Sequence, residues 1–249
     1  MKREFGLIGY PLTHSFSRKF FSDKFSEEGI NAEYLNFELE NISLLPHIIG
    51  SHPDLQGLNV TIPYKEEVLK YLDSIDDEAA QVQAVNTIRI RRSGHRIALQ
   101  GYNTDIQGFQ ESIRPLVRQQ HHKALVLGTG GASKAIVQAL KNLKIDSILV
   151  SRNPEDKGEI SYNDLDEDVM ASYKIVVNTT PIGTFPKVDA CPAIPFELIT
   201  PSHLMFDLIY NPEMTEFLKQ GLKHGATIKN GLEMLHLQAI ASWEIWNRD

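Results

Sequence analysis

The 249-residue sequence predicts an α/β fold with two domains, because its first and second parts show different arrangements of strands and helices. In the first part, short apolar strands alternate with helical patterns and lead into a hairpin. In the second part, which begins near Lys123, buried apolar strands are separated by helical segments, as in a parallel sheet. We expect domains of residues 1–105 and 106–231, with the C-terminal helix, residues 232–249, packing back on the first domain.

Charge and residue usage exclude several classes of partner. A net charge of -7 and a pI near 5.7 argue against nucleic acid or an anionic membrane, and leave small anionic ligands open. No apolar run reaches membrane-spanning length, and the apolar start is too short for a signal peptide, so we expect a cytoplasmic protein. The single cysteine, Cys191, excludes an intrachain disulfide and has no obvious histidine partner. The histidines show no convincing metal spacing, so no metal is expected.

The first domain is expected to contain alternating strands and helices followed by a hairpin. The hairpin turn is the segment Ser93-Gly94-His95, between two alternating runs. The arginines of the hairpin are expected on its solvent face. The expected elements are strands at 5–8, 34–37 and 58–61, helices near 18–28 and 44–49, and hairpin strands at 86–92 and 96–102.

A lysine stands in an unusual place in residues 57–65 (GLNVTIPYK), just after an apolar strand. Pro63 predicts the start of a helix that continues amphipathically over residues 65–72. A cation in that first turn faces the positive end of the helix dipole, which suggests a role in proton transfer for Lys65. A solvated lysine whose stem covers apolar surface is an equally good interpretation.

The second domain opens with a glycine-rich turn, residues 128–133 (GTGGAS), between a buried strand at 124–127 and a helix at 135–140. Small residues let the backbone approach a pyrophosphate at the helix N-terminus, so the segment predicts a dinucleotide-binding unit. Ser133 stands where Gly or Ala is usual, and a plain tight turn is the alternative. Further strands are expected at 147–151, 173–178, 204–208 and 226–228, and the last helix at 232–246.

The end of the next strand predicts which cofactor is bound. It carries Ser151-Arg152-Asn153 and no acid that could hold the ribose hydroxyls of NAD. Arg152, together with Lys157, instead suits the 2′-phosphate of NADP. A surface arginine in a charged loop with Glu155 and Asp156 is the alternative.

Seven segments resemble, in order along the chain, the signatures of the shikimate dehydrogenase family. Together they span nearly the whole chain, and the first three and the last are particular to this family. The segments are residues 9–17 (GYPLTHSFS), 59–66 (NVTIPYKE), 84–87 (AVNT), 103–105 (NTD), the glycine turn, 178–183 (NTTPIG) and 230–238 (NGLEMLHLQ).

The resemblance implies reversible, NADPH-dependent reduction of 3-dehydroshikimate to shikimate, on the route to chorismate and the aromatic amino acids. It implies an N-terminal αβ substrate domain plus a Rossmann-type parallel-sheet NADP domain, in a monomer or a homodimer. The catalytic pair would be Lys65 and Asp105. The substrate residues would be Ser15 and Ser17 at the carboxylate, and Thr61, Asn86, Tyr210 and Gln238 at the ring hydroxyls. The cofactor residues would be Asp77, Gly128, Thr129, Gly130, Gly131, Ala132, Arg152, Asn153, Lys157, Thr180, Leu208 and Gly231.

Several of these residues have structural alternatives. Asp105 would be the N-cap of a helix over residues 106–116, and Asn86 could satisfy a turn. Tyr210 could be a half-buried aromatic residue, and Gln238 could lie on a solvent-facing stripe.

The function also has alternatives. They are a quinate or dual quinate/shikimate dehydrogenase, a catalytically idle NADPH-responsive binding protein, and a tetrahydrofolate-linked dehydrogenase, which would leave the serines at the substrate carboxylate unexplained. The sequence departs from the family pattern around Arg18 and Arg152 and at Thr184.

Overall fold

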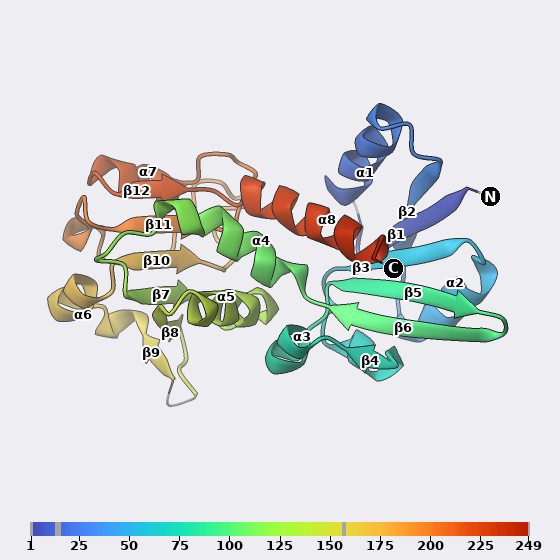
Figure 1. The fold of residues 1–249 in the computed structure, drawn as a ribbon. Helices are drawn as coiled ribbons and strands as arrows, with labels where there is room; N and C mark the ends of the chain where they lie inside the picture. The colour runs from blue at the N-terminus through green and yellow to red at the C-terminus, as the bar shows by residue number, and fades with distance from the viewer. Residues whose placement is uncertain (1, 13–15, 156–157, 249) are drawn as a thin grey trace. The chain divides into compact units, whose positions relative to one another are not determined.

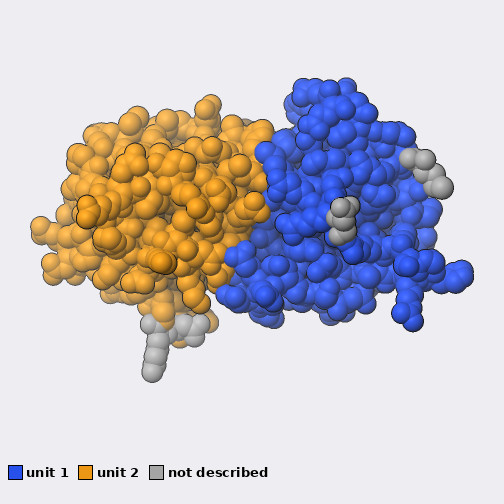
Figure 2. Space-filling view, in the orientation of Figure 1, with its two compact units in different colours: residues 1–104, 239–249 blue, residues 105–238 orange. Residues whose placement is uncertain are grey.

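The computed structural model describes residues 2–12, 16–155 and 158–248 (Figure 1). The chain forms two compact units, which Figure 2 colours separately. Unit 1 consists of residues 1–104 and 239–249, and unit 2 consists of residues 105–238. The expected C-terminal segment is therefore divided, with residues 232–238 in unit 2 and the rest in unit 1.

Unit 1 is built on a mixed sheet with the strand order β2-β1-β3-β5-β6-β4. β1 runs parallel to β2 and β3, whereas β5 is antiparallel to both β3 and β6. The predicted hairpin is confirmed, and its turn contains Gly94 at φ 59°. The strands are β1 (Arg3–Gly9), β2 (Ala32–Glu38), β3 (Leu55–Val60), β4 (Ser74–Ile75), β5 (Thr87–Ser93) and β6 (Arg96–Tyr102).

Apolar side chains are buried on both faces of this sheet, because successive strand residues point to opposite sides. On one face, Ile8 packs in a cluster with residues of α2. On the other face, Phe5 packs with aromatic residues of α1 and α8, and its ring stacks on Trp246 with centroids 4.9 Å apart. The helical segments of unit 1 are α1 (Phe16–Glu27), η1 (Ile42–Leu44), α2 (Leu45–Ser51), η2 (Glu67–Tyr71) and α3 (Asp77–Val82).

The predicted helix starting at Pro63 is wrong. Lys65 lies in a turn, and only a short 3₁₀ helix, η2, follows it. The reason is that the carbonyl of Lys65 accepts a hydrogen bond from the backbone N–H of Val85 at 2.8 Å. Leu69 donates instead to the carbonyl of Glu66 at 3.2 Å, so the segment closes with the tighter i to i+3 pattern. The helix-dipole argument for Lys65 therefore does not apply.

The expectation that the hairpin arginines lie on a solvent face is wrong for Arg89. Its residue is only 9% exposed, whereas Arg91 and Arg92 are exposed. Arg89 lies on β5 between Gly57 of β3 and Gln100 of β6, and its side chain hydrogen-bonds to Tyr102. The alternating pattern alone gave no sign that β5 would be an interior strand.

Unit 2 contains the predicted parallel sheet, with the strand order β12-β11-β10-β7-β8-β9. The chain adds β8 and β9 on one side of β7, and then β10, β11 and β12 on the other side. In such a sheet, ligands bind outside the carboxyl ends of the strands where the order reverses, here β7 and β10. The strands are β7 (Lys123–Leu127), β8 (Asp146–Ser151), β9 (Glu159–Ser161), β10 (Ile175–Asn178), β11 (Leu204–Asp207) and β12 (Thr227–Lys229).

The helices associated with unit 2 include several that were not predicted, because they are too short to show a clear period. The terminal helix α8 has the predicted bounds. None of the helices in the described ranges is long and apolar enough to cross a membrane. The helical segments are α4 (Thr104–Ile113), η3 (Arg114–Leu116), α5 (Gly131–Asn142), η4 (Tyr162–Asp164), α6 (Glu167–Ser172), η5 (Phe196–Leu198), α7 (Glu216–Lys223) and α8 (Leu232–Trp246).

Candidate functional site

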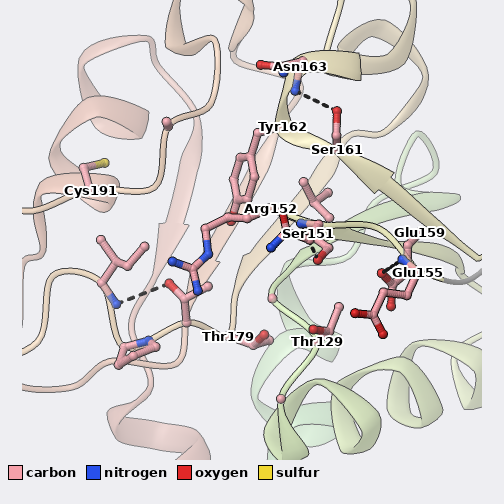
Figure 3. Close-up of a pocket in the computed structure, with 18 residues that line it drawn as sticks. Thr129, Ser151, Arg152, Glu155, Glu159, Ser161, Tyr162, Asn163, Thr179 and Cys191 are labelled. Atoms are coloured by element: carbon pink, nitrogen blue, oxygen red, sulfur yellow. Dashed lines mark hydrogen bonds between the residues drawn. The ribbon is translucent and has the colours of Figure 1, made fainter.

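A cavity of about 910 Å³ lies in unit 2 at the carboxyl ends of β7, β8 and β10 (Figure 3). It is thus at the place where the strand order reverses. The cavity brings together residues from segments that the sequence analysis treated separately. The predicted cofactor residues that line it are Gly128, Thr129, Gly130, Arg152, Asn153 and Thr180.

The glycine turn presents open backbone to this cavity. Gly128 has φ 103°, a value that other residues rarely adopt. A side chain built on Gly130, the N-cap of α5, would meet no atom within 4 Å. Gly131 and Ala132 form the first turn of α5, where free N–H groups and the helix dipole favour an anionic group.

Ser133 explains how the turn tolerates its departure from the usual motif. The residue is 1% exposed, and its hydroxyl donates to the carbonyl of Gly130 at 2.6 Å. The small polar side chain is therefore satisfied within the turn and leaves the cavity side open.

The wall formed after β8 carries charges of both signs. Arg152 is exposed and lies close enough to Tyr162 that its charge lowers the pKa of the phenol, although burial has the larger effect and raises it. Glu159 and Glu155 line the same cavity, and a carboxylate oxygen of Glu159 accepts the N–H of Glu155 at 3.1 Å. Lys157, the second basic residue predicted here, lies outside the described residues.

The loop after β10 is ordered by side-chain hydrogen bonds. The side-chain oxygen of Asn178 accepts from the backbone N–H of Thr180 at 3.0 Å and from its hydroxyl at 2.7 Å. The Thr180 hydroxyl in turn accepts the N–H of Ile182 at 3.3 Å. Thr180 and Ile182 both face the cavity as a consequence.

Leu208 and Gly231, two predicted cofactor residues, lie against each other outside the cavity lining. The backbone N–H of Leu208 donates to the carbonyl of Asn178 at 3.0 Å. A side chain at Gly231 would collide with the carbonyl of Leu208, so only glycine fits there. The backbone at both positions is thus fixed next to the β10 loop.

In unit 1, Thr61, Lys65 and Asn86 lie around one turn. The N–H of Thr61 donates to the carbonyl of Ile8 at 2.9 Å, and Lys65 is half-buried. Asn86 is 3% exposed, and its side-chain oxygen accepts from the backbone N–H of Thr104 at 2.7 Å. The Asn86 side chain therefore has a structural bond to the first residue of α4, 18 residues away, and this bond does not belong to a local turn.

Of the two serines predicted at the substrate carboxylate, one lies within the described residues. Ser17, in α1, hydrogen-bonds to the phenol of Tyr34, which donates to the side-chain oxygen of Asn59 at 2.8 Å. Ser15 lies outside the described residues.

Asp105, Gln238 and Asp77 are predicted site residues that lie in helices. The structural alternatives given for Asp105 and Gln238 are wrong. Helix α4 begins at Thr104, so Asp105 lies in its first turn and is not the predicted N-cap. Gln238 is 8% exposed and donates to the carbonyl of Leu235 at 2.9 Å, which excludes the solvent-facing stripe. Asp77 begins α3 of unit 1, behind the N-cap Asp76, and its cofactor role stays a prediction.

Tyr210 follows β11 and is 41% exposed. Its ring is therefore accessible in unit 2, and its substrate role stays a prediction.

Sequence reasoning missed several residues that line the cavity, notably Tyr162 and Thr179. Tyr162 follows the very short strand β9, which has no recognisable pattern. Cys191 also faces the cavity, and burial raises the pKa of its thiol to about 12, with further contributions from Glu216 and Asp207. The thiol is therefore a poor nucleophile. Within the described ranges, no three His, Cys, Asp or Glu side chains gather as a metal site would require.

Comparison with known proteins gives consistent results for both halves of the chain. Residues 7–88 match the family model described as the shikimate dehydrogenase substrate binding domain. A curated shikimate dehydrogenase (NADP(+)) from Methanococcus vannielii is 38% identical, over 97% of this chain and 90% of that protein.

Solved structures agree with this. A chorismate mutase/shikimate 5-dehydrogenase fusion protein from Clostridium acetobutylicum is 36% identical, with a TM-score of 0.87 over 99% of this chain and 92% of that one. A shikimate dehydrogenase in complex with NADP⁺ is 30% identical, with a TM-score of 0.85 over 99% of this chain and 90% of that one.

Proposed function

We propose a residue-level mechanism from one premise: the chain belongs to the shikimate dehydrogenase family. It is an NADP-dependent oxidoreductase that interconverts 3-dehydroshikimate and shikimate, in the pathway to chorismate and the aromatic amino acids.

One observation carries the assignment of the cofactor: the open glycine turn, Arg152 and Thr180 line a single cavity of unit 2. The residues fit a dinucleotide. The backbone at Gly130 faces free space, the N-terminus of α5 suits a pyrophosphate, and the exposed guanidinium of Arg152 suits a 2′-phosphate. When bound, NADPH supplies the hydride.

The chain's own residues supply the proton and hold the substrate. The ammonium group of Lys65 gives a proton to the substrate oxygen as the carbonyl is reduced, and takes it back in the reverse direction. Asp105 is the second member of the proposed catalytic pair and contributes the charge of its carboxylate. Ser15 and Ser17 donate hydrogen bonds to the substrate carboxylate. The ring hydroxyls contact Thr61, Asn86, Tyr210 and Gln238.

In this proposal most of the residues that bind shikimate belong to unit 1, whereas Tyr210 and Gln238 belong to unit 2, which also binds NADP. The protein works in the cytoplasm, as a monomer or a homodimer. Sedimentation of the purified chain measures its oligomeric state directly.

The deciding assay is the initial rate of cofactor reduction with shikimate or quinate and with NADP or NAD. We expect turnover with shikimate and NADP to exceed the other three combinations. A higher rate with quinate would favour the quinate dehydrogenase alternative. Binding of NADPH without turnover of either substrate would favour the idle binding protein.

The proposed pair is tested by Asp105→Asn. The amide keeps a polar side chain in the first turn of α4 but removes the charge, so kcat should fall. If kcat is unchanged and only the melting temperature falls, Asp105 serves the helix and does not act on Lys65.

A further inference from the structure

Asp207 is a buried carboxylate to which the proposed mechanism gives no role. It is the last residue of β11 and pairs in register with Asn178, the last residue of β10. Both residues are 0% exposed. They lie directly beneath the two loops that leave the carboxyl ends of these strands, where the ligand site of a parallel sheet is formed.

The carboxylate of Asp207 collects donors from three segments. One oxygen, Oδ1, accepts from the side-chain amide of Asn178 at 3.0 Å and from the backbone N–H of Ile209 at 3.1 Å. The other oxygen, Oδ2, accepts from the hydroxyl of Thr215 at 2.6 Å. All three partners are uncharged donors, and an ionised carboxylate can only accept.

The first of these bonds helps to orient Asn178, whose amide nitrogen also donates to the carbonyl of Ile182 at 3.5 Å. Because its amide nitrogen donates to Asp207, its oxygen points to Thr180 and accepts two bonds there. The backbone N–H of Thr180 can only donate, so a reversed amide would set donor against donor. The position of Thr180 and Ile182 in the cavity therefore depends on Asp207 through Asn178.

The other two bonds fix the loop that follows β11. The bond to Ile209 holds the backbone immediately before Tyr210, and the bond to Thr215 holds the residue that caps α7. The hydroxyl of Thr215 also accepts a hydrogen bond from the backbone N–H of Leu218 at 3.3 Å, so this hydroxyl both donates and accepts. Both ends of the Tyr210 segment are thus tied to one carboxylate.

We infer that Asp207 is a positioning residue, which acts through Asn178 on the nucleotide-facing loop and through Ile209 on the turn that carries Tyr210. Its single carboxylate thus positions both the loop that faces the cofactor and the turn that carries a predicted substrate residue. This inference rests on the proposed function, because it takes Thr180 and Tyr210 as ligand contacts.

The test compares two substitutions that cut the network at different points. Asp207→Ala removes both branches, so it should raise the Kd for NADP about tenfold, the effect of one lost buried hydrogen bond to a charged group, and raise the KM for shikimate as well. Asn178→Ala removes only the first branch, so it should raise the Kd for NADP by a similar factor and leave the KM for shikimate nearly unchanged. Combining the two should weaken NADP no more than Asp207→Ala alone.

The conservative change Asp207→Asn separates positioning from general stability. Its Oδ1 can still accept from Asn178 and Ile209, so it should restore most of the NADP affinity that Asp207→Ala loses. A matched control is His203→Gln, at the opposite end of β11, which is also buried and should lower the melting temperature without changing the Kd for NADP.

The outcomes distinguish the inference from the function on which it rests. The inference is overturned if Asn178→Ala leaves the Kd for NADP unchanged, a result that decides the matter even if Asp207→Ala does not fold. The inference is also overturned if the effects of Asp207→Ala and Asn178→Ala on the Kd for NADP are fully additive. Positioning weakens NAD and NADP alike, whereas Arg152→Ala should weaken only NADP. A wild-type chain that does not bind NADP would instead contradict the proposed function.

Discussion

In unit 1 the buried polar network beneath the predicted site is made of neutral side chains, whereas in unit 2 it is centred on a carboxylate. The hydroxyl of Ser242 in α8 accepts the side-chain amide of Asn59 at 2.9 Å and lies 2.8 Å from the hydroxyl of Thr87. Thr87 and Thr104 both bond to the side-chain oxygen of Asn86. The unit 1 network thus ties a predicted substrate residue to a helix from the far end of the chain.

The difference reflects how each site is made. The cavity of unit 2 lies at the carboxyl ends of strands, and one carboxylate can collect the donors of the adjoining loops. The predicted site of unit 1 lies on a mixed sheet, and its polar side chains share hydroxyl and amide groups that can both donate and accept. A neutral network has no titration of its own, whereas one with a carboxylate depends on pH. The substitutions below test this division.

The largest effect is expected at Lys65 in unit 1. Without a proton donor, Lys65→Ala should lower kcat by roughly 10² to 10⁴, with little change in the KM for shikimate or the Kd for NADP, because the loss is confined to the transition state. Steady-state kinetics and a binding titration measure both quantities. Lys70→Ala, an exposed lysine in η2, is the matched control and should leave kcat unchanged. Near-normal turnover in Lys65→Ala would remove Lys65 from the mechanism.

The next effect is expected at Arg152 in unit 2. Arg152→Ala should weaken NADP by about 10- to 150-fold through the loss of a charge-assisted contact with the 2′-phosphate, while NAD binding barely changes. The Kd of each cofactor is measured for both proteins. Arg118→Ala, another exposed arginine of unit 2 that does not line the cavity, should leave both affinities unchanged. An equal loss for NAD and NADP would mean that Arg152 supports the loop.

A smaller effect, on stability, is expected for the neutral network. Ser242→Ala leaves buried groups of Asn59 and Thr87 without this partner, which should lower the free energy of unfolding by about 1 to 3 kcal/mol. Denaturant titrations should give the same difference from wild type at pH 7.5 and pH 5.5. Ser26→Ala, on the exposed side of α1, serves as the control and should cost far less. A difference that changes with pH would show that the network is coupled to a titrating group.

The smallest effect is expected at His203, a buried neutral histidine of unit 2. It is 1% exposed and bonds to the carbonyl of Met170 at 3.0 Å, and burial lowers the pKa of its imidazole below 6.5. Its contribution to stability is therefore present above pH 6.5 and is lost as the pH falls through the lowered pKa of the folded state. His203→Gln should abolish this pH-dependent loss of stability.

Unfolding curves of wild type and His203→Gln between pH 7.5 and pH 5 measure this contribution. The advantage of wild type should shrink as the pH falls, by at most about 1.4 kcal/mol per pH unit for one proton. Asp207 contributes with the opposite sign, because burial raises its pKa to about 6, and its stability term is lost as the pH rises through that value. A constant difference between the two proteins would mean that His203 does not titrate on unfolding.

The sequence was most informative where a pattern is long or where a motif is fixed by backbone geometry. The hairpin, the parallel sheet and helix α8 were predicted with nearly the observed bounds, because each has enough residues for its period to be read. The glycine turn could be assigned because its glycines form a recognisable motif, and the positive φ at Gly128 shows why glycine is favoured there. The comparisons confirm the family, the NADP cofactor and the activity that these motifs implied.

Other features depended on contacts between distant segments, which no local pattern contains. The turn at Lys65 replaced a predicted helix because Val85, twenty residues away in sequence, takes the carbonyl that a helix would use. Arg89 is buried on β5, a strand that pairs on both sides, and its side chain hydrogen-bonds to Tyr102, 13 residues further along the chain.

By itself, then, the sequence determined the fold class, the dinucleotide-binding turn and the family, since these follow from periodicity and from residues that act through their own backbone. Only the tertiary structure decided that Asp207 and Asn178, 29 residues apart, share one hydrogen bond beneath the nucleotide cavity. It also decided that Tyr162 and Arg152 face the same space. The physical reason is that strand pairing sets which side chains meet, and a hydrogen bond between them leaves no trace in the sequence of either segment.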